Sequence, residues 1–137
     1  MAKHRDYQRA KVYKAEDLVK VGSIKFKSLA ETQEFVNSIV KSCWYKNRFF
    51  RWSRVKVEDG RKVAYGFPTE GFIHAPKWAR TNLFILHEFA HVIGRMDVPD
   101  HGKEFCALYL LLVKRWIGPD CAKELKEKFK EFGVEYR

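Results

Sequence analysis

Apolar side chains recur at helical spacing in four segments of the chain, and each segment predicts a helix. The first predicted helix, residues 29–41, follows Ser28, and Glu31 stands three positions after Ser28 as in a capping box. The other three cover residues 81–93, 102–116 and 120–132, and a glycine follows each of them, at Gly94, Gly118 and Gly133. The first 22 residues are mainly polar, and we expect them to lie across the surface of the domain, with Val12 and Tyr13 as candidate anchors.

Shorter stretches between the first and second helices predict strands. Residues 51–56 read as an extended segment, and Asp59-Gly60 is a typical hairpin turn that leads into a second strand at residues 62–65. A third strand at residues 71–75 ends before Pro76. The pattern predicts a single α+β domain over residues 1–137. Its order is an N-terminal helix, a small antiparallel sheet, an active-site helix and two C-terminal helices.

The predicted helix at residues 81–93 is apolar on almost every side, yet it contains the sequence His87-Glu88-Phe89-Ala90-His91. Histidines four positions apart project from one helix face, at a separation that one Zn²⁺ ion can bridge. Glu88 stands beside them and can take a proton from a zinc-activated water without binding the metal itself. Burying these polar groups without partners would be costly, and a metal satisfies them together. The motif predicts a zinc-dependent hydrolase with Glu88 as the general base.

A catalytic zinc site usually has three protein ligands and one open position, so a third ligand is needed. His101 stands where the next predicted helix begins, and the loop after Gly94 is short enough to bring it back over the first helix. Asp97 has the spacing of a metzincin variant, although no later methionine provides that group's Met-turn. Glu104, one turn into the next helix, would make a gluzincin-like site or orient a histidine. We favour His101 and keep Asp97 and Glu104 as alternatives.

Around these residues the chain resembles the small HExxH metallohydrolases of actinobacteria and their bacteriophages, over nearly its whole length. The matching segments are residues 5–13, 78–81, 101–105 (His-Gly-Lys-Glu-Phe) and 116–119. An HGxxF element after an HExxH helix is also similar to the SprT-like zinc proteases, in which that histidine is the third ligand. The resemblance implies a zincin-like fold, a phage-related metallopeptidase and a protein or peptide substrate. The longer loop at residues 96–100 and the missing zinc ribbon weaken the transfer of the substrate class.

Charge and composition add expectations about partners and location. The formal net charge of +10 attracts polyanions, so nucleic acid is a candidate partner beside a solvated lysine-rich surface. An odd count of three cysteines without a CxxC pair argues against disulfides and fits a reducing cytoplasm. We find no secretion signal and no apolar run long enough to span a membrane, and expect a cytoplasmic protein with no membrane partner.

Several other residues have chemistry that the motif does not use. Residues 44–54 interleave aromatic and cationic side chains, which could stack bases and pair phosphates of single-stranded nucleic acid or could simply fill the core. His74 lies on the strand before the active-site helix and could face the cleft, although a surface histidine is the commoner case. Three tyrosines are conceivable oxyanion donors, and no spacing rule selects one of them: Tyr45, Tyr65 and Tyr109.

Overall fold

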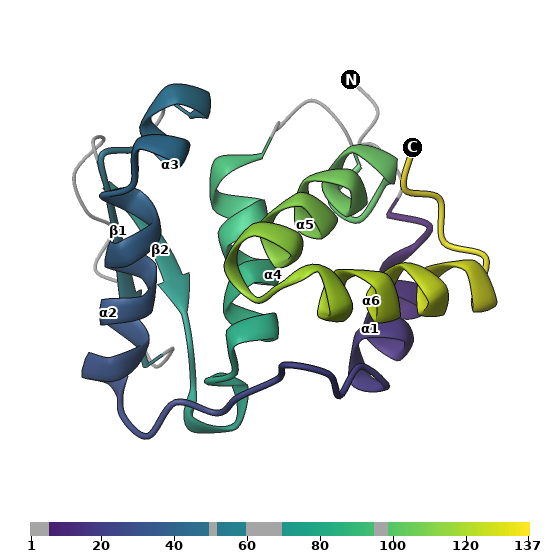
Figure 1. The fold of residues 1–137 in the computed structure, drawn as a ribbon, viewed down its shortest axis with the longest axis horizontal. Helices are drawn as coiled ribbons and strands as arrows, with labels where there is room; N and C mark the ends of the chain where they lie inside the picture. Colours follow the sequence, from purple (N-terminus) through teal and green to yellow (C-terminus); the bar gives the residue numbers. More distant parts are fainter. Residues whose placement is uncertain (1–5, 50–51, 60–69, 95–98) are drawn as a thin grey trace. The chain divides into compact units, whose positions relative to one another are not determined.

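The computed structural model describes residues 6–49, 52–59, 70–94 and 99–137 (Figure 1). The chain forms two compact units. One is the continuous segment Ile24–Ile93, and the other combines Met1–Ser23 with Gly94–Arg137. The α+β class is confirmed, since the described residues include six α-helices and a two-stranded sheet.

The continuous unit contains the predicted N-terminal and active-site helices. Its elements are α2 (Leu29–Val40), α3 (Cys43–Arg48), β1 (Arg54–Glu58), β2 (Glu70–His74), the 3₁₀ turn η1 (Lys77–Ala79) and α4 (Asn82–Ile93). The cap predicted for α2 is present, because the hydroxyl of Ser28 accepts a hydrogen bond of 3.1 Å from the backbone N–H of Glu31. Neither α3 nor η1 was predicted, since each is too short to show a periodic pattern.

The sheet is parallel, and the antiparallel prediction is wrong. Strand β1 pairs directly with β2 in a register that sets Val55 opposite Gly71 and Val57 opposite Ile73. Alternation of apolar and polar residues marks a strand but does not give the direction of its partner. Parallel neighbours need a long connection instead of a tight turn, and residues 59–69 separate the two strands. The predicted turn at Gly60 and the strand at 62–65 lie outside the described residues.

Both flanking helices of the continuous unit contact the sheet, α2 at β1 and α4 at β2. Strand β2 approaches α4 so closely that a Cβ atom at Gly71 would lie 2.6 Å from Cγ1 of Val92. Helix α2 is tied to β1 by the side-chain amide of Gln33, which donates to the carbonyl of Val55 (2.8 Å) and accepts from the N–H of Val57 (2.7 Å). The amide pairs with the strand as a neighbouring strand would.

The second unit consists of α1 (Arg9–Asp17), α5 (Lys103–Trp116) and α6 (Pro119–Glu131). Helices α5 and α6 confirm the two predicted C-terminal helices, and Gly133 follows α6 with a φ of 70°, as expected of a C-terminal glycine stop. Helix α1 was not predicted. The burial of Val12 agrees with its expected role as an anchor, whereas the full burial of Ala15 corrects the expectation that this stretch only lies across the surface. A short helix with so few apolar positions gives little periodic signal.

Candidate metal centre

Helix α4 is fixed at its start and along its buried side. The side-chain oxygen of Asn82 accepts from the N–H groups of Ile24 (3.1 Å) and Leu83 (2.8 Å). The hydroxyl of Thr81 accepts from the N–H of Phe84 at 3.1 Å and caps the first turn. Behind the histidines the helix buries a row of large apolar side chains, namely Ile85, Leu86 and Phe89. The positions of His87 and His91 are therefore set by an ordered apolar core.

The two histidines of α4 have the spacing that a shared metal requires. Their Nε2 atoms lie 3.2 Å apart, and their rings are T-shaped with centroids separated by 5.0 Å. Two nitrogens bound to one tetrahedral zinc, each at 2.0–2.1 Å, would lie about 3.3 Å apart. His87 is fully buried and His91 is partly exposed. The pair alone already fits two adjacent corners of a tetrahedral site.

His101, the favoured third ligand, is held from several sides within its own unit. It directly precedes Gly102, the N-cap of α5, and its carbonyl accepts a hydrogen bond of 2.9 Å from Nε2 of Gln8. Its ring packs against Tyr13 on α1 and Phe105 on α5, with centroid distances of 5.5 and 5.2 Å. These contacts leave the buried imidazole little freedom to turn.

Asp6 gives the His101 ring its orientation, and sequence reasoning missed this residue. Its Oδ2 atom lies 2.9 Å from Nδ1 of His101. A carboxylate accepting from Nδ1–H fixes the tautomer in which Nε2 carries the free lone pair, which is the usual support of a metal-bound histidine. Asp6 stands 95 positions before its partner, and no local pattern marks it. The one sequence signal that includes Asp6 is the resemblance over residues 5–13, which gives it no role.

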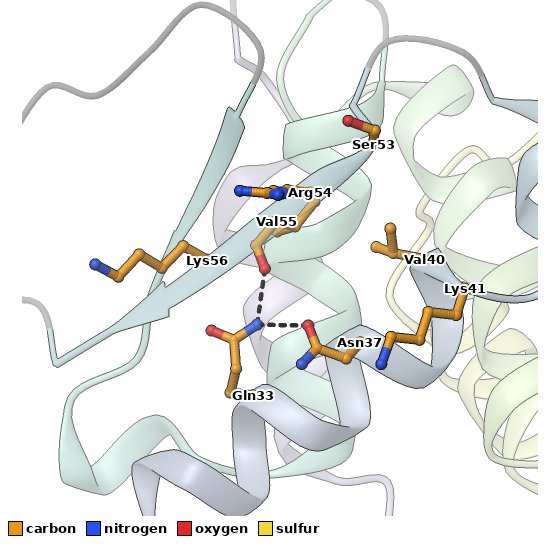
Figure 2. A pocket seen from close by; sticks show the side chains of 8 residues that line it. All are labelled: Gln33, Asn37, Val40, Lys41, Ser53, Arg54, Val55 and Lys56. Atoms are coloured by element: carbon orange, nitrogen blue, oxygen red, sulfur yellow. Dashed lines mark hydrogen bonds between the residues drawn. The ribbon is translucent and has the colours of Figure 1, made fainter.

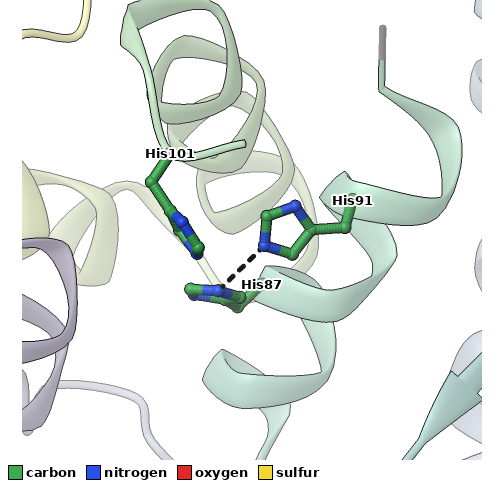
Figure 3. A group of neighbouring side chains, drawn as sticks. All are labelled: His87, His91 and His101. Atoms are coloured by element: carbon green, nitrogen blue, oxygen red, sulfur yellow. Dashed lines mark hydrogen bonds between the residues drawn. The ribbon is translucent and has the colours of Figure 1, made fainter. Parts of the chain in front are cut away.

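Three of the predicted site residues form a group that could hold a metal ion. The ligand atoms of His87, His91 and His101 all lie within 4.8 Å of one another, and Figure 3 shows their rings turned toward a common point. Among the described residues, Glu104 does not belong to this group. Asp97, the other alternative, lies outside the described residues. Three imidazoles so placed can hold a metal ion.

A second polar group lies in the core of the same unit as His101. Glu16 on α1 is buried, and burial raises the pKa of its carboxyl to about 8, although a hydrogen bond from the Tyr109 hydroxyl (2.9 Å) acts to lower it. Burial also raises the pKa of the Cys106 thiol to about 12, helped by Glu16 and Asp6. The carboxyl of Glu16 is therefore protonated at neutral pH.

The remaining candidate residues do not join the cluster. The hydroxyl of Tyr45 donates to the carbonyl of Trp52 at 2.7 Å and that of Tyr109 donates to Glu16, so both are engaged in the core. Tyr65 lies outside the described residues. His74 lies on β2 opposite Glu58 and is not one of the grouped histidines. None of these residues gains support as a site residue.

The aromatic and cationic stretch divides between core and surface. Tyr45 is buried and packs edge-on against Phe89. Trp52 is partly buried, and its indole donates to the carbonyl of Val92 at 2.9 Å, so both rings contribute to the core. Trp44 stays half-exposed, with the Arg48 guanidinium 5.0 Å from its ring centre. Phe50 and Arg51 lie outside the described residues. The core interpretation thus holds for two of the rings.

A pocket of about 360 Å³ lies between α2 and β1 (Figure 2). Lys41, Arg54 and Lys56 line it together with Asn37, and none of its lining residues in the described part of the chain is acidic. Lys56 also pairs with Glu58 at 3.6 Å. In Figure 2 the side chain of Lys56 extends away from Lys41 and Asn37, so the positive charges are spread along the pocket.

Comparisons with known proteins add no relative. The chain matches no protein-family model, no curated protein and no solved structure. Its resemblance to HExxH metallohydrolases and SprT-like proteases therefore stays a prediction. Cys43, Cys106 and Cys121 are free cysteines, the first exposed and the other two buried. Among the described residues, no helix has both the length and the apolar character needed to cross a membrane.

Proposed function

We propose that this protein is a zinc-dependent hydrolase, a metallopeptidase, in which His87, His91 and His101 hold the metal and Glu88 is the general base. The observation that carries the proposal is the grouping of three imidazoles within 4.8 Å, two of them with Nε2 atoms 3.2 Å apart. Neutral imidazole suits zinc better than magnesium or calcium, which prefer oxygen ligands. Three protein ligands would leave the fourth tetrahedral position for water or substrate.

Each residue has a separate role in the proposed reaction. Zinc, when bound, supplies Lewis acidity that polarises the substrate carbonyl and makes a water acidic enough to lose its proton near neutrality. Glu88 follows His87 directly and precedes His91 by three positions, so helix geometry places the three side chains in one sector of α4. In the proposal Glu88 accepts the proton of the water and later delivers it to the leaving amine. Asp6 keeps His101 in its metal-binding tautomer.

The direct test separates metal binding from turnover. We expect purified protein to bind one zinc ion and to hydrolyse members of a panel of unfolded proteins and peptides. Glu88→Gln should keep the zinc and lose at least about 100-fold in kcat, because the general base is gone. Glu127→Gln, an exposed change on α6, is the matched control and should leave both unchanged. A Glu88→Gln protein that hydrolyses at the wild-type rate would show the mechanism to be wrong.

The pocket between α2 and β1 favours a second candidate function, a nucleic-acid-binding protein in which zinc is mainly structural. Its lysine and arginine side chains lie in a chain of net charge +10, which suits the phosphates of a single strand. Binding of a single-stranded oligonucleotide that weakens with salt, persists in Glu88→Gln and accompanies no hydrolysis would favour this function over the first.

A further inference from the structure

Trp78 is the most exposed of the large apolar side chains among the described residues, with 74% of its surface accessible. It belongs to η1, the single turn between Pro76 and the start of α4. Leaving an indole in water forfeits a large hydrophobic stabilisation, which a bound apolar group would recover. The indole N–H also makes no hydrogen bond to the described residues, so a donor as well as a ring face is available.

The backbone that carries Trp78 is held in place. The N–H of Ala79, which is buried, donates to the carbonyl of Pro76 at 2.8 Å. The next residue, Arg80, accepts from the N–H of Phe26 at 2.7 Å through its carbonyl and donates from Nε to the carbonyl of Ala75 at 2.9 Å. An exposed ring on a fixed backbone can bind without first being ordered, which lowers the cost of binding.

Trp78 is the outer end of a row of rings that reaches the candidate metal ligands. Its ring meets that of Phe84 at 66° with centroids 5.5 Å apart, and Phe84 in turn lies parallel to His87, at 8° and 6.1 Å. Phe84, His87 and His91 stand at positions i, i+3 and i+7 of α4, so they share one helix face. The rings of Trp78 and Phe84 meet edge-on, so together they present one ring face and one ring edge. A third aromatic ring can contact both, because aromatic side chains pack face to edge.

We propose that Trp78 and Phe84 form a subsite that binds an aromatic or large aliphatic side chain of the peptide substrate. The inference rests on the proposed hydrolase function, because the row of rings gains a role in substrate selection only if the histidines hold a catalytic metal. The Phe84 ring contacts both Trp78 and His87, with centroid distances of 5.5 and 6.1 Å, and an extended peptide rises about 3.3 Å per residue. The recognised side chain should therefore lie within about four residues of the scissile bond.

The test is a set of peptides that differ only in one residue near the cleaved bond. We expect wild-type protein to prefer Phe, Tyr, Trp, Leu or Met over Ala at that position. In Trp78→Ala, kcat/KM for the aromatic peptide should fall by roughly tenfold, mainly through KM, and kcat/KM for the Ala peptide should not change. Trp78→Phe should restore most of the preference. Trp44→Ala, which removes a half-exposed ring on α3, is the control.

Binding without turnover provides a second measurement. Zinc-loaded Glu88→Gln should bind the aromatic peptide roughly tenfold more tightly than Glu88→Gln/Trp78→Ala, while both contain equal zinc. Hydrolysis without preference for apolar residues would overturn the subsite and leave the proposed function standing. Absence of hydrolysis by wild type would overturn both. Trp78→Ala could instead leave peptide cleavage unchanged and lose oligonucleotide binding or self-association. Either result would assign the ring to a nucleic acid or to a second copy of the chain and overturn the inference.

Discussion

The histidines of α4 and the histidine before α5 are held by contacts of different kinds. His87 and His91 stand four positions apart on one helix, and the buried apolar side chains of that helix set their direction. His101 lies in a turn, and its position depends on polar contacts with Asp6 and Gln8, which precede it by 95 and 93 positions. Regular secondary structure supplies two of the proposed ligands from local sequence, whereas the third depends on pairing of distant segments.

Gln8 links three segments of the chain that are far apart in the sequence. Its buried amide donates to the carbonyls of His101 (2.9 Å) and Glu135 (3.1 Å) and accepts from the N–H of Glu135 (2.6 Å). One side chain thus joins the start of α1, the turn of His101 and the C-terminal segment. Buried polar contacts of this kind are costly when one partner is lost. We therefore expect the geometry of His101 to be more easily disturbed than that of the pair on α4.

The largest expected effect comes from removing a ligand from either side. His91→Ala and His101→Ala should each weaken zinc binding by more than about 100-fold. The binding free energy of zinc in a protein site is roughly 10–16 kcal/mol and comes from only three or four ligands, so the loss of one ligand removes a large part of it. Competition against a chromophoric chelator measures the change. His74→Ala removes a histidine of β2 outside the cluster and should bind zinc as the wild type does. If His101→Ala kept wild-type affinity, the third ligand would have to be sought elsewhere, with Asp97 and Glu104 tested first.

The same contrast explains what could be predicted from the sequence. The HExxH spacing and the Ser28 cap are local, and the structure contains both the histidine pair and the cap. Ligand chemistry and loop reach favour His101 from the sequence, and its role as the third ligand stays a prediction, although the three histidines are grouped closely enough to hold a metal ion. The role of Asp6 could not be predicted, because only folding brings it to His101. The parallel direction of β1 and β2 could not be predicted for a similar reason. The alternation of apolar and polar residues in one strand does not show in which direction its partner runs.

The next effect is a pH dependence of stability that comes from Glu16. Burial raises its pKa to about 8 in the folded protein, above its ordinary value of 4.5. The folded state therefore holds a proton that the unfolded state loses, so this contribution is complete below about pH 4.5 and is lost as pH rises through 8. From pH 6 to 9 the metal-free protein should lose roughly 2–3 kcal/mol of unfolding free energy through this group.

Glu16→Gln should flatten this dependence, because an amide can still accept from Tyr109 and does not ionise. Urea denaturation of the metal-free proteins at pH 6 and pH 9 measures the difference, and Glu127→Gln serves as the exposed control. An equal loss of stability in Glu16→Gln and wild type would mean that Glu16 is not the group responsible.

The smallest expected effect is that of Asp6→Asn, which keeps the shape of the side chain and removes its charge. A neutral amide supports the Nδ1–H of His101 less strongly than a carboxylate, so zinc affinity should fall by about 10- to 100-fold, less than in His101→Ala. Asp17→Asn, an exposed change on α1, should leave zinc affinity unchanged.

The unfolding transition of the metal-free Asp6→Asn protein distinguishes a role of Asp6 in orienting His101 from a role in folding. A loss of zinc affinity with an unchanged transition supports the orienting role of Asp6. A large loss of stability would make Asp6 a folding residue, and unchanged affinity would show that His101 keeps its metal-binding orientation without the carboxylate.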